Sequence, residues 1–411
     1  MKGVIGMLIG IRSYALVATC ALGTFASIEP AATRIGSCSD PVVFGTTISA
    51  TGQFSVNADR WVKMTQVFEE EINKRGGVKL AGCGGNSVPL KFVIYDDQSN
   101  PTNAVSQTEK LVTVDGVDVL VGPDWTPIGF PVSPIPDKHK IPDVLGNVSA
   151  LQIFQRGFKY IFGSPTPSVF VWSDRYFDLL AKEANPPKSI FFVVQDNLFT
   201  KDVVTSAEKK AQQSGMKVVG NELFPADTKD FSSIVLRMKA AGPDVIYISS
   251  FDAPALPLIN QMRQLRVTAK SVHSVYATGK MIKAIGKNME DITGVMQWLP
   301  SLNTPYSDLV KDVLEKSDVD WTDYLFTVGR LNSYIVMLQA VEKAGVVDRE
   351  KIRDALSQST FTSPVGDVKF GENGYAVMQA FPTQIQDGKI VAVGPEDQVP
   401  GHLRYPAPTW Q

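Results

Sequence analysis

Short apolar runs alternate with helical stripes along most of the chain. Runs rich in valine, isoleucine and aromatic residues predict strands at Pro41–Ile48, Leu90–Tyr95, Val117–Val121, Ile141–Leu145, Ser189–Gln195, Lys217–Leu223, Asp244–Ser249 and Ala269–Val275. Between the first two, Trp61, Met64, Phe68 and Ile72 fall three and four residues apart, which is the spacing of one helix face. Repeated strand–helix–strand units of this length predict an α/β fold with parallel sheets covered by helices on both faces.

The chain has 411 residues, which is too long for one compact core, so we expect two lobes. Phe158–Ser164 followed by Pro165 and Pro167 predicts a crossing into a second lobe, and Val295–Pro300 predicts a return. A third crossing is expected near Pro364, before a hairpin that turns at Asp387-Gly388. The predicted lobes are residues 40–163 with 298–364, and 164–297 with 365–398. Three passages between two lobes make a hinge.

The N-terminus has the pattern of a secretory signal peptide. Lys2 and Arg12 precede a short apolar run that ends in small residues, so we expect residues 1–26 to be removed and the protein to be periplasmic. The alternative is a frayed apolar tail. Cys20 follows a sequence that loosely resembles a lipoprotein cleavage site, but Thr19 departs from the usual small residue and argues against a lipid anchor.

Two cysteines remain after that removal, an even number in an oxidising compartment. We predict a disulfide between Cys38 and Cys83, which would tie the start of the mature chain to the Gly-rich segment 81–85. The alternative is two unrelated thiols. The histidines, His139, His273 and His402, are isolated from one another and from the cysteines, so neither a metal site nor a cofactor is expected.

Charge limits the choice of partners. The formal net charge of −2 provides no basic surface for nucleic acid, and no run after the N-terminus is apolar enough to span a bilayer. An enzyme on a doubly wound fold would need a phosphate-binding glycine loop after a strand, or an activated nucleophile. Neither the segment around Cys83 nor any Gly-x-Ser-x-Gly pattern meets that need.

One strand end carries candidate binding chemistry. Gly122-Pro123 stops the buried strand Val117–Val121, and a helix starting near Pro127 would direct its first N–H groups and the Thr126 hydroxyl beyond the sheet edge. Such an arrangement suits an anion. The alternative is that Thr126 is a plain helix cap without a ligand.

Several tracts, in a fixed order, resemble one protein family. They are Thr51-Gly52, Glu71–Gly77, Tyr95–Pro101, Val121–Pro123, Asp230–Ser232, Lys239–Asp244 and Phe370–Gly374. From Pro41 to about Val393 the chain resembles the type I periplasmic solute-binding proteins of branched-chain amino acid ABC importers. The resemblance implies a two-lobed clamp with three hinge crossovers, which traps a small solute and presents it to a membrane permease.

The resemblance also implies a set of ligand-binding positions: Asn57, Trp125, Thr126, Val148, Ser149, Phe199, Phe251, Asp252 and Tyr276. Thr126 would bind the ligand carboxylate, and a backbone carbonyl at Val148 and the Ser149 hydroxyl would hold its polar head. Phe199 and Phe251 would line the second lobe's side. Trp125 could instead cover a lobe core, and Asp252 could cap a helix.

The chain departs from the family where amino-acid binders carry an acid for the ligand ammonium. That region reads His273–Thr278 and contains no acidic residue. A buried ammonium without a counter-charge is costly, so either Asp252 takes this role or the ligand has no ammonium. Trp125, Phe199, Phe251 and Tyr276 together suggest a bulky or aromatic acid. A sensor domain that hands its closed form to a receptor is the remaining alternative to import.

Overall fold

The computed structural model describes residues 38–163, 168–302, 304–323, 325–396 and 399–410. The predicted signal peptide with Cys20, and Pro165 and Pro167 of the first crossing, lie outside the described residues. The backbone of Asn57 is described but its side chain is not.

The first sheet has five parallel strands in the order β4-β1-β5-β6-β7. Its strands are β1 (Val42–Ile48), β4 (Leu90–Asp96), β5 (Val119–Val121), β6 (Asp143–Val144) and β7 (Ile161–Phe162). Strands β5 and β6 are shorter than the apolar runs that predicted them, and β7 lies in the segment read as the first crossing. The predicted strand–helix–strand units are confirmed, because these strands pair in parallel and a helix lies between each one and the next along the chain.

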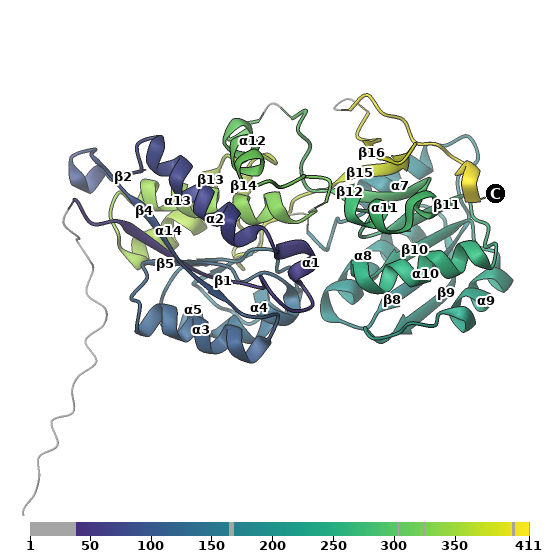
Figure 1. Cartoon of the computed structure of the whole chain (residues 1–411), viewed down its shortest axis with the longest axis horizontal. Helices are drawn as coiled ribbons and strands as arrows, with labels where there is room; N and C mark the ends of the chain where they lie inside the picture. The colour runs from purple at the N-terminus through teal and green to yellow at the C-terminus, as the bar shows by residue number, and fades with distance from the viewer. Residues whose placement is uncertain (1–37, 164–167, 303, 324, 397–398, 411) are drawn as a thin grey trace, which may run out of the picture. The chain divides into compact units, whose positions relative to one another are not determined.

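Helices cover both faces of this sheet, with α3, α4 and α5 on one face and α2 and α13 on the other (Figure 1). The helices of this lobe are α1 (Ser55–Ala58), α2 (Trp61–Lys74), α3 (Pro101–Thr113), α4 (Thr126–Val132), α5 (Pro134–Lys138), α6 (Leu151–Phe154), α12 (Ser307–Lys316), α13 (Thr327–Ala344) and α14 (Arg349–Gln358). Helix α13 is buried on nearly all sides. A helix with no solvent face is a core element, which explains its lack of a polar stripe.

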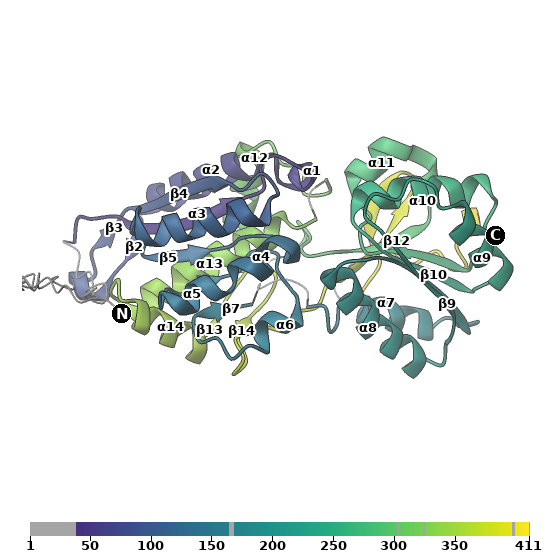
Figure 2. The same cartoon turned by 90° about the horizontal axis from the view of Figure 1, so that it is seen from below.

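The second sheet has seven strands in the order β16-β15-β12-β11-β10-β8-β9. Its strands are β8 (Ser189–Gln195), β9 (Lys217–Phe224), β10 (Val245–Ser249), β11 (Ser271–Ser274), β12 (Ile292–Met296), β15 (Phe381–Gln386) and β16 (Lys389–Ala392). Helices α7 (Asp174–Ala181) and α8 (Leu198–Gln213) lie on one face, and α10 (Asp252–Gln264) and α11 (Gly279–Ile285) on the other (Figure 2), with α9 (Ser232–Ala241) beside β9. Strands β15 and β16 form the predicted hairpin, whose turn residues Asp387 and Gly388 both have positive φ.

The chain passes between the two sheets after β7, after β12 and before β15. The third passage differs in detail from the expectation near Pro364. Strand β14 (Val368–Lys369) pairs with β13 (Thr360–Phe361), and Phe370 packs on Phe162 of the first sheet. The second sheet is joined only at Phe381, because the pairing with β13 keeps this segment on the first lobe.

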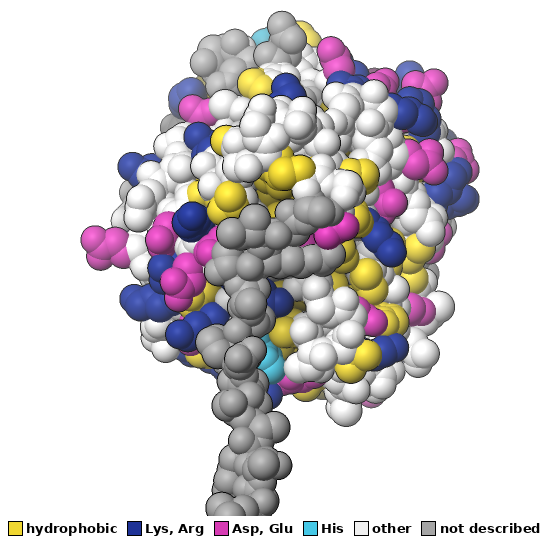
Figure 3. All heavy atoms as spheres, turned by 90° about the vertical axis from the view of Figure 1, so that its left-hand side faces the viewer, with side chains coloured by type: hydrophobic (Ala, Val, Ile, Leu, Met, Phe, Trp, Pro, Cys, Tyr) yellow, Lys and Arg dark blue, Asp and Glu magenta, His cyan; other side chains and the backbone are white. Residues whose placement is uncertain are grey.

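A disulfide joins Cys38 to Cys83, as predicted. Cys83 ends a 3-10 turn between the short paired strands β2 (Val78–Lys79) and β3 (Ser87–Val88). On the face shown in Figure 3, charges of both signs are interspersed without a large patch of either sign. Within the described ranges, no helix has the length and apolarity needed to cross a membrane.

Candidate ligand-binding site

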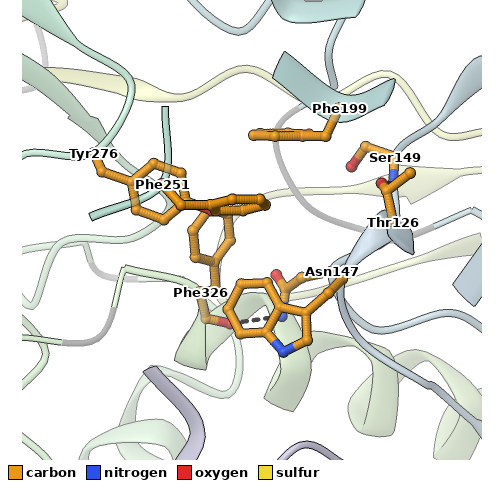
Figure 4. Close-up of a pocket in the computed structure, with 8 residues that line it drawn as sticks. Thr126, Asn147, Ser149, Phe199, Phe251, Tyr276 and Phe326 are labelled. Carbon is orange, nitrogen blue, oxygen red and sulfur yellow. Dashed lines mark hydrogen bonds between the residues drawn. The ribbon is translucent and has the colours of Figure 1, made fainter. Parts of the chain in front are cut away.

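A pocket forms between the two lobes, where loops from the carboxyl ends of both sheets meet (Figure 4). Its lining residues are Trp125, Thr126, Asn147, Ser149 and Phe326 from the first lobe, and Phe199, Phe251 and Tyr276 from the second. The empty volume, counted out to the solvent opening, is about 260 Å³. Six of the nine sequence-predicted positions are therefore brought together.

Trp125, which directly precedes α4 and lines the first-lobe side of the pocket, has an unusual backbone conformation. Its φ is 65° and its ψ is 124°, a combination that costs a bulky residue about 1–3 kcal/mol. The Trp125 N–H donates to the carbonyl of Asn147 at 3.2 Å, which holds the strained turn against the neighbouring strand's loop. Its indole ring stacks on Trp61 and on Phe54, at centroid distances of 5.5 and 5.3 Å. Trp125 therefore packs on the core of its lobe and also lines the pocket.

A buried polar network supports the same loops from below. Asp124 forms an ion pair with Arg330, and both side chains are fully buried. The Asn147 side-chain amide donates to Asp124 Oδ1 at 2.7 Å and to the carbonyl of Phe326 at 3.0 Å (Figure 4). Its Oδ1 accepts from Gln297 at 3.3 Å. Both N–H groups of Asn147 are used in this way, so its side chain positions the pocket loop and has no donor left for a ligand.

Thr126 and Ser149 lie side by side on the first-lobe wall (Figure 4). The Thr126 hydroxyl oxygen accepts the Ser149 N–H at 3.3 Å, which leaves the hydroxyl hydrogen available as a donor. The Ser149 hydroxyl makes no hydrogen bond within the described ranges. Two hydroxyl donors on adjacent loops can hold the two oxygens of a carboxylate.

One expectation about the α4 terminus is wrong. The N–H groups of Ile128 and Gly129 do not point freely into the crevice, because both donate to the Trp125 carbonyl, at 3.0 and 2.8 Å. Pro127 has no N–H. The strained Trp125 backbone turns its carbonyl into the helix, so these two N–H groups are not available to an anion.

The rest of the pocket wall is aromatic. Phe251 lies 6.1 Å from Phe199 in a stacked arrangement and 5.5 Å from Tyr276 edge to face. Tyr276 in turn lies 5.0 Å from Phe326, and Phe326 lies 5.5 Å from Trp125. These five rings contact one another at ordinary aromatic distances and form one continuous aromatic wall. Burial, with a smaller contribution from the charge of Asp252, raises the pKa of the Tyr276 hydroxyl well above its usual value, so this ring stays neutral.

Asp252 does not line the pocket. It begins helix α10, is almost fully buried, and accepts a 3.4 Å hydrogen bond from the Thr278 hydroxyl. The side chain of Val148 packs in a small core cluster with Leu145 and Ile153 instead of facing the cavity. The side chain of Asn57 is outside the part of the chain that the structure describes, so its predicted role stays a prediction.

His273 also lies away from the pocket, on β11 in the core of the second lobe. Its ring contacts the Ser173 and Thr293 hydroxyls at 3.3 and 3.1 Å and stacks on Tyr176 at 4.3 Å. Complete burial lowers the pKa of His273 to about 3, which keeps the imidazole neutral. His273 is therefore a core residue, like the other three residues of β11, all of which are buried.

Asn147 and Phe326 were missed by sequence reasoning. Asn147 lies in the loop Gly146–Ser149 that the sequence did single out, so an amide in that loop was the available signal. Phe326 precedes α13, nearly 180 residues further along the chain, and no local pattern marks it. Only the packing of α13 against the first sheet brings it to the pocket.

The lining residues contain no aspartate, glutamate, lysine or arginine. Among the residues that the structure describes, no group of histidine, cysteine and acidic side chains could hold a metal ion. The pocket wall combines aromatic rings with the hydroxyl donors of Thr126 and Ser149, and these hydroxyls are groups that can bind a carboxylate. It offers no counter-charge to an ammonium group.

Comparison with known proteins shows the family of this chain and the solved structures that share its fold. Residues 41–389 match the family model described as periplasmic binding protein. A leucine-, isoleucine-, valine-, threonine- and alanine-binding protein of Pseudomonas aeruginosa is 26% identical over 369 residues, covering 87% of this chain and 91% of the relative.

Solved structures with the same fold include a leucine-binding protein of Thermotoga maritima, with 20% identity, a TM-score of 0.73, and coverage of 87% of this chain and 99% of the other. A solute-binding protein of R. palustris in complex with 4-hydroxybenzoate has 22% identity, a TM-score of 0.71, and coverage of 86% and 95%. These likenesses confirm the predicted two-lobed type I fold. The chain therefore belongs to the periplasmic binding protein family, a family of solute-binding proteins and not of enzymes.

Proposed function

We propose that this protein is the extracytoplasmic solute-binding component of an ABC importer, and that its solute is a small aromatic carboxylate without an ammonium group. The observation that carries the proposal is the pocket wall of five aromatic rings and two hydroxyl residues without a charged side chain. An amino acid would place its ammonium there without a counter-charge, at a cost of several kcal/mol.

The carboxylate is bound by the hydroxyls of Thr126 and Ser149, and the ring of the solute lies between Phe199, Phe251 and Trp125. Charge-assisted hydrogen bonds contribute about 1.5–3 kcal/mol each, so two of them plus ring burial reach the −8 kcal/mol of a micromolar complex. The 4-hydroxybenzoate and benzoate bound by two R. palustris neighbours are solutes of this chemical class.

The mature protein acts outside the cytoplasm, after removal of residues 1–26, and delivers its closed form to a membrane permease without chemical turnover. The Cys38–Cys83 disulfide supports an oxidising compartment, because such bonds persist in the periplasm and are reduced in the cytosol.

A thermal-shift screen of the mature chain tests the ligand class. Phenylalanine and 3-phenylpropionate share a ring and a carboxylate and differ only by the ammonium group. We expect 3-phenylpropionate, benzoate or 4-hydroxybenzoate to raise Tm, with about 2.7 kcal/mol of stabilisation at a hundredfold excess over Kd. Leucine and phenylalanine should have no effect. Stabilisation by leucine and not by any of the ammonium-free acids would overturn the proposed solute.

A further inference from the structure

Contacts between the lobes occur outside the pocket as well as within it. At one edge of the pocket, Lys280 of α11 donates to the carbonyl of Val56 in α1 and lies 3.6 Å from Asp59 Oδ1. These groups face each other where α1 and α11 approach across the gap between the lobes (Figure 2). The Lys280 side chain is 25% exposed, so its charge is only partly screened by water.

The same helix makes two further contacts with the first lobe. The Gly279 N–H donates to the Thr322 carbonyl at 2.7 Å, and a Cβ at residue 279 would lie 2.4 Å from Asp323 Oδ1. Lys283 pairs with Asp323 at 2.5 Å. The start of α11 is therefore fitted closely against the segment that precedes α13.

A second contact closes the other edge. Asp202 of α8 accepts the Leu151 N–H at 3.2 Å, and Leu151 is the first residue of α6 in the first lobe. In the view of Figure 2, α6 and α8 lie on the side of the molecule opposite to α1 and α11. A carboxylate at an uncapped helix start satisfies an N–H that otherwise needs water.

We propose that Lys280 and Asp202 are positioning residues that set the affinity for the solute by holding the lobes closed, although neither lines the pocket. The term closure contacts is used below for two sets of residues. The first is Lys280 with Asp59 and Val56, and the second is Asp202 with Leu151. This inference rests on the proposed function, since it assumes that closure traps a solute. A ligand that binds only the closed form gains apparent affinity in proportion to the closed population.

The closure contacts act on an equilibrium that exists without ligand. Each of the five residues stays on its own lobe when the lobes separate, so the interaction energy is lost only in the open form. Removing a contact then lowers the closed fraction, increases the dissociation rate, and leaves the folding of each lobe unchanged. Added salt screens the Lys280 pair and produces part of the same loss.

The double variant Lys280→Met with Asp202→Ala tests this inference in the mature chain. The matched control is Lys201→Met with Asp178→Ala, because Lys201 pairs with Asp196 and Asp178 with Lys210, all within the second lobe. In small-angle X-ray scattering without ligand, we expect a larger radius of gyration for the double variant than for wild type, and no change for the control. Equal radii for all three proteins would overturn the inference.

Binding of benzoate supplies the second readout. We expect the double variant to bind about threefold to tenfold more weakly, through faster dissociation, with a smaller effect of salt on affinity than in wild type. Unchanged benzoate affinity in the double variant would contradict the role of these residues. Failure of benzoate to bind wild type counts against the proposed solute, and the scattering comparison then decides the closure contacts by itself.

Discussion

The two lobes contribute different kinds of wall to the same pocket. The first-lobe wall is tied to a buried ionic network, in which Asp124 pairs with Arg330 and receives two hydrogen bonds from Asn147. The second-lobe wall consists of Phe199, Phe251 and Tyr276, and the polar cluster beneath it around His273 is neutral.

This difference indicates a division of labour in recognition. Hydrogen bonds need exact geometry, so the hydroxyls of Thr126 and Ser149 lie on loops that are fixed by charge-assisted bonds. In the proposed binding mode, the second-lobe wall supplies apolar and ring contacts and no charged group. The ionic network is the more sensitive of the two to mutation.

Replacing Arg330 with methionine should have the largest effect. The variant leaves Asp124 buried without its ion-pair partner, and breaking a buried pair costs about 3–5 kcal/mol of stability. Urea unfolding measures the loss. Arg237→Met is the control, because the exposed Arg237–Glu222 pair should contribute only about 0.2–1 kcal/mol. Similar losses of unfolding free energy in Arg330→Met and Arg237→Met would show that the buried ion pair stabilises the fold no more than the exposed pair does.

Replacing Thr126 with valine tests the polar wall without changing its shape. Loss of the hydroxyl removes one charge-assisted hydrogen bond and should weaken benzoate binding by about 1.5–3 kcal/mol, which is roughly tenfold to more than a hundredfold. Isothermal titration measures the change. Val148→Ala, at a buried position beside the pocket, is the control for indirect packing effects. If Thr126→Val weakened benzoate binding less than Val148→Ala does, the Thr126 hydroxyl would not be the group that binds the carboxylate.

Acid should destabilise the protein through His273. In the fold its pKa is about 3, whereas in the unfolded chain it has the ordinary value near 6.5, so between these values only the unfolded state takes up the proton. The stabilisation is complete above pH 6.5 and falls as the pH is lowered, by about 1.2 kcal/mol between pH 7 and 5.5.

His273→Gln should remove that part of the pH dependence, as measured by urea unfolding of both proteins at each pH. Asp97 and Asp143 act in the opposite direction, because burial raises their pKa values, but they are common to both proteins and cancel in the comparison. His402→Gln, at an exposed position, is the control. If the unfolding free energy of His273→Gln depended on pH in the same way as that of wild type, protonation of His273 would not contribute to the acid sensitivity.

Replacing Phe251 with leucine should have the smallest effect. The variant keeps an apolar wall and loses only ring-to-ring contacts, worth about 0.5–1 kcal/mol, or twofold to fivefold in benzoate affinity. Binding of an aliphatic acid such as 4-methylpentanoate should change less than binding of benzoate. Equal losses for both acids would show that the second-lobe wall does not distinguish aromatic from aliphatic solutes.

The sequence alone indicated the alternation of strands and helices, the parallel strands they connect and the hairpin at Asp387-Gly388, because these depend on periodicity and turn residues that are local in the chain. It did not indicate that β15 and β16 extend the second sheet in antiparallel fashion. It also determined that Cys38 and Cys83 could pair. Since parallel strands present their carboxyl ends at one edge, the loops with Thr126 and Ser149 could be assigned to a common site, whereas Phe251 of the second lobe was assigned through the family resemblance.

Only the tertiary structure decided which side chains of those loops face the cavity. Asp252 begins α10 and turns toward Thr278, while Phe326 reaches the pocket from a helix nearly 180 residues away from Asn147. The Asp124–Arg330 pair and the closure contacts likewise join residues distant in sequence. Local patterns specify elements and their order, but contacts of this kind depend on how the finished sheets and helices pack, which no short window of sequence contains.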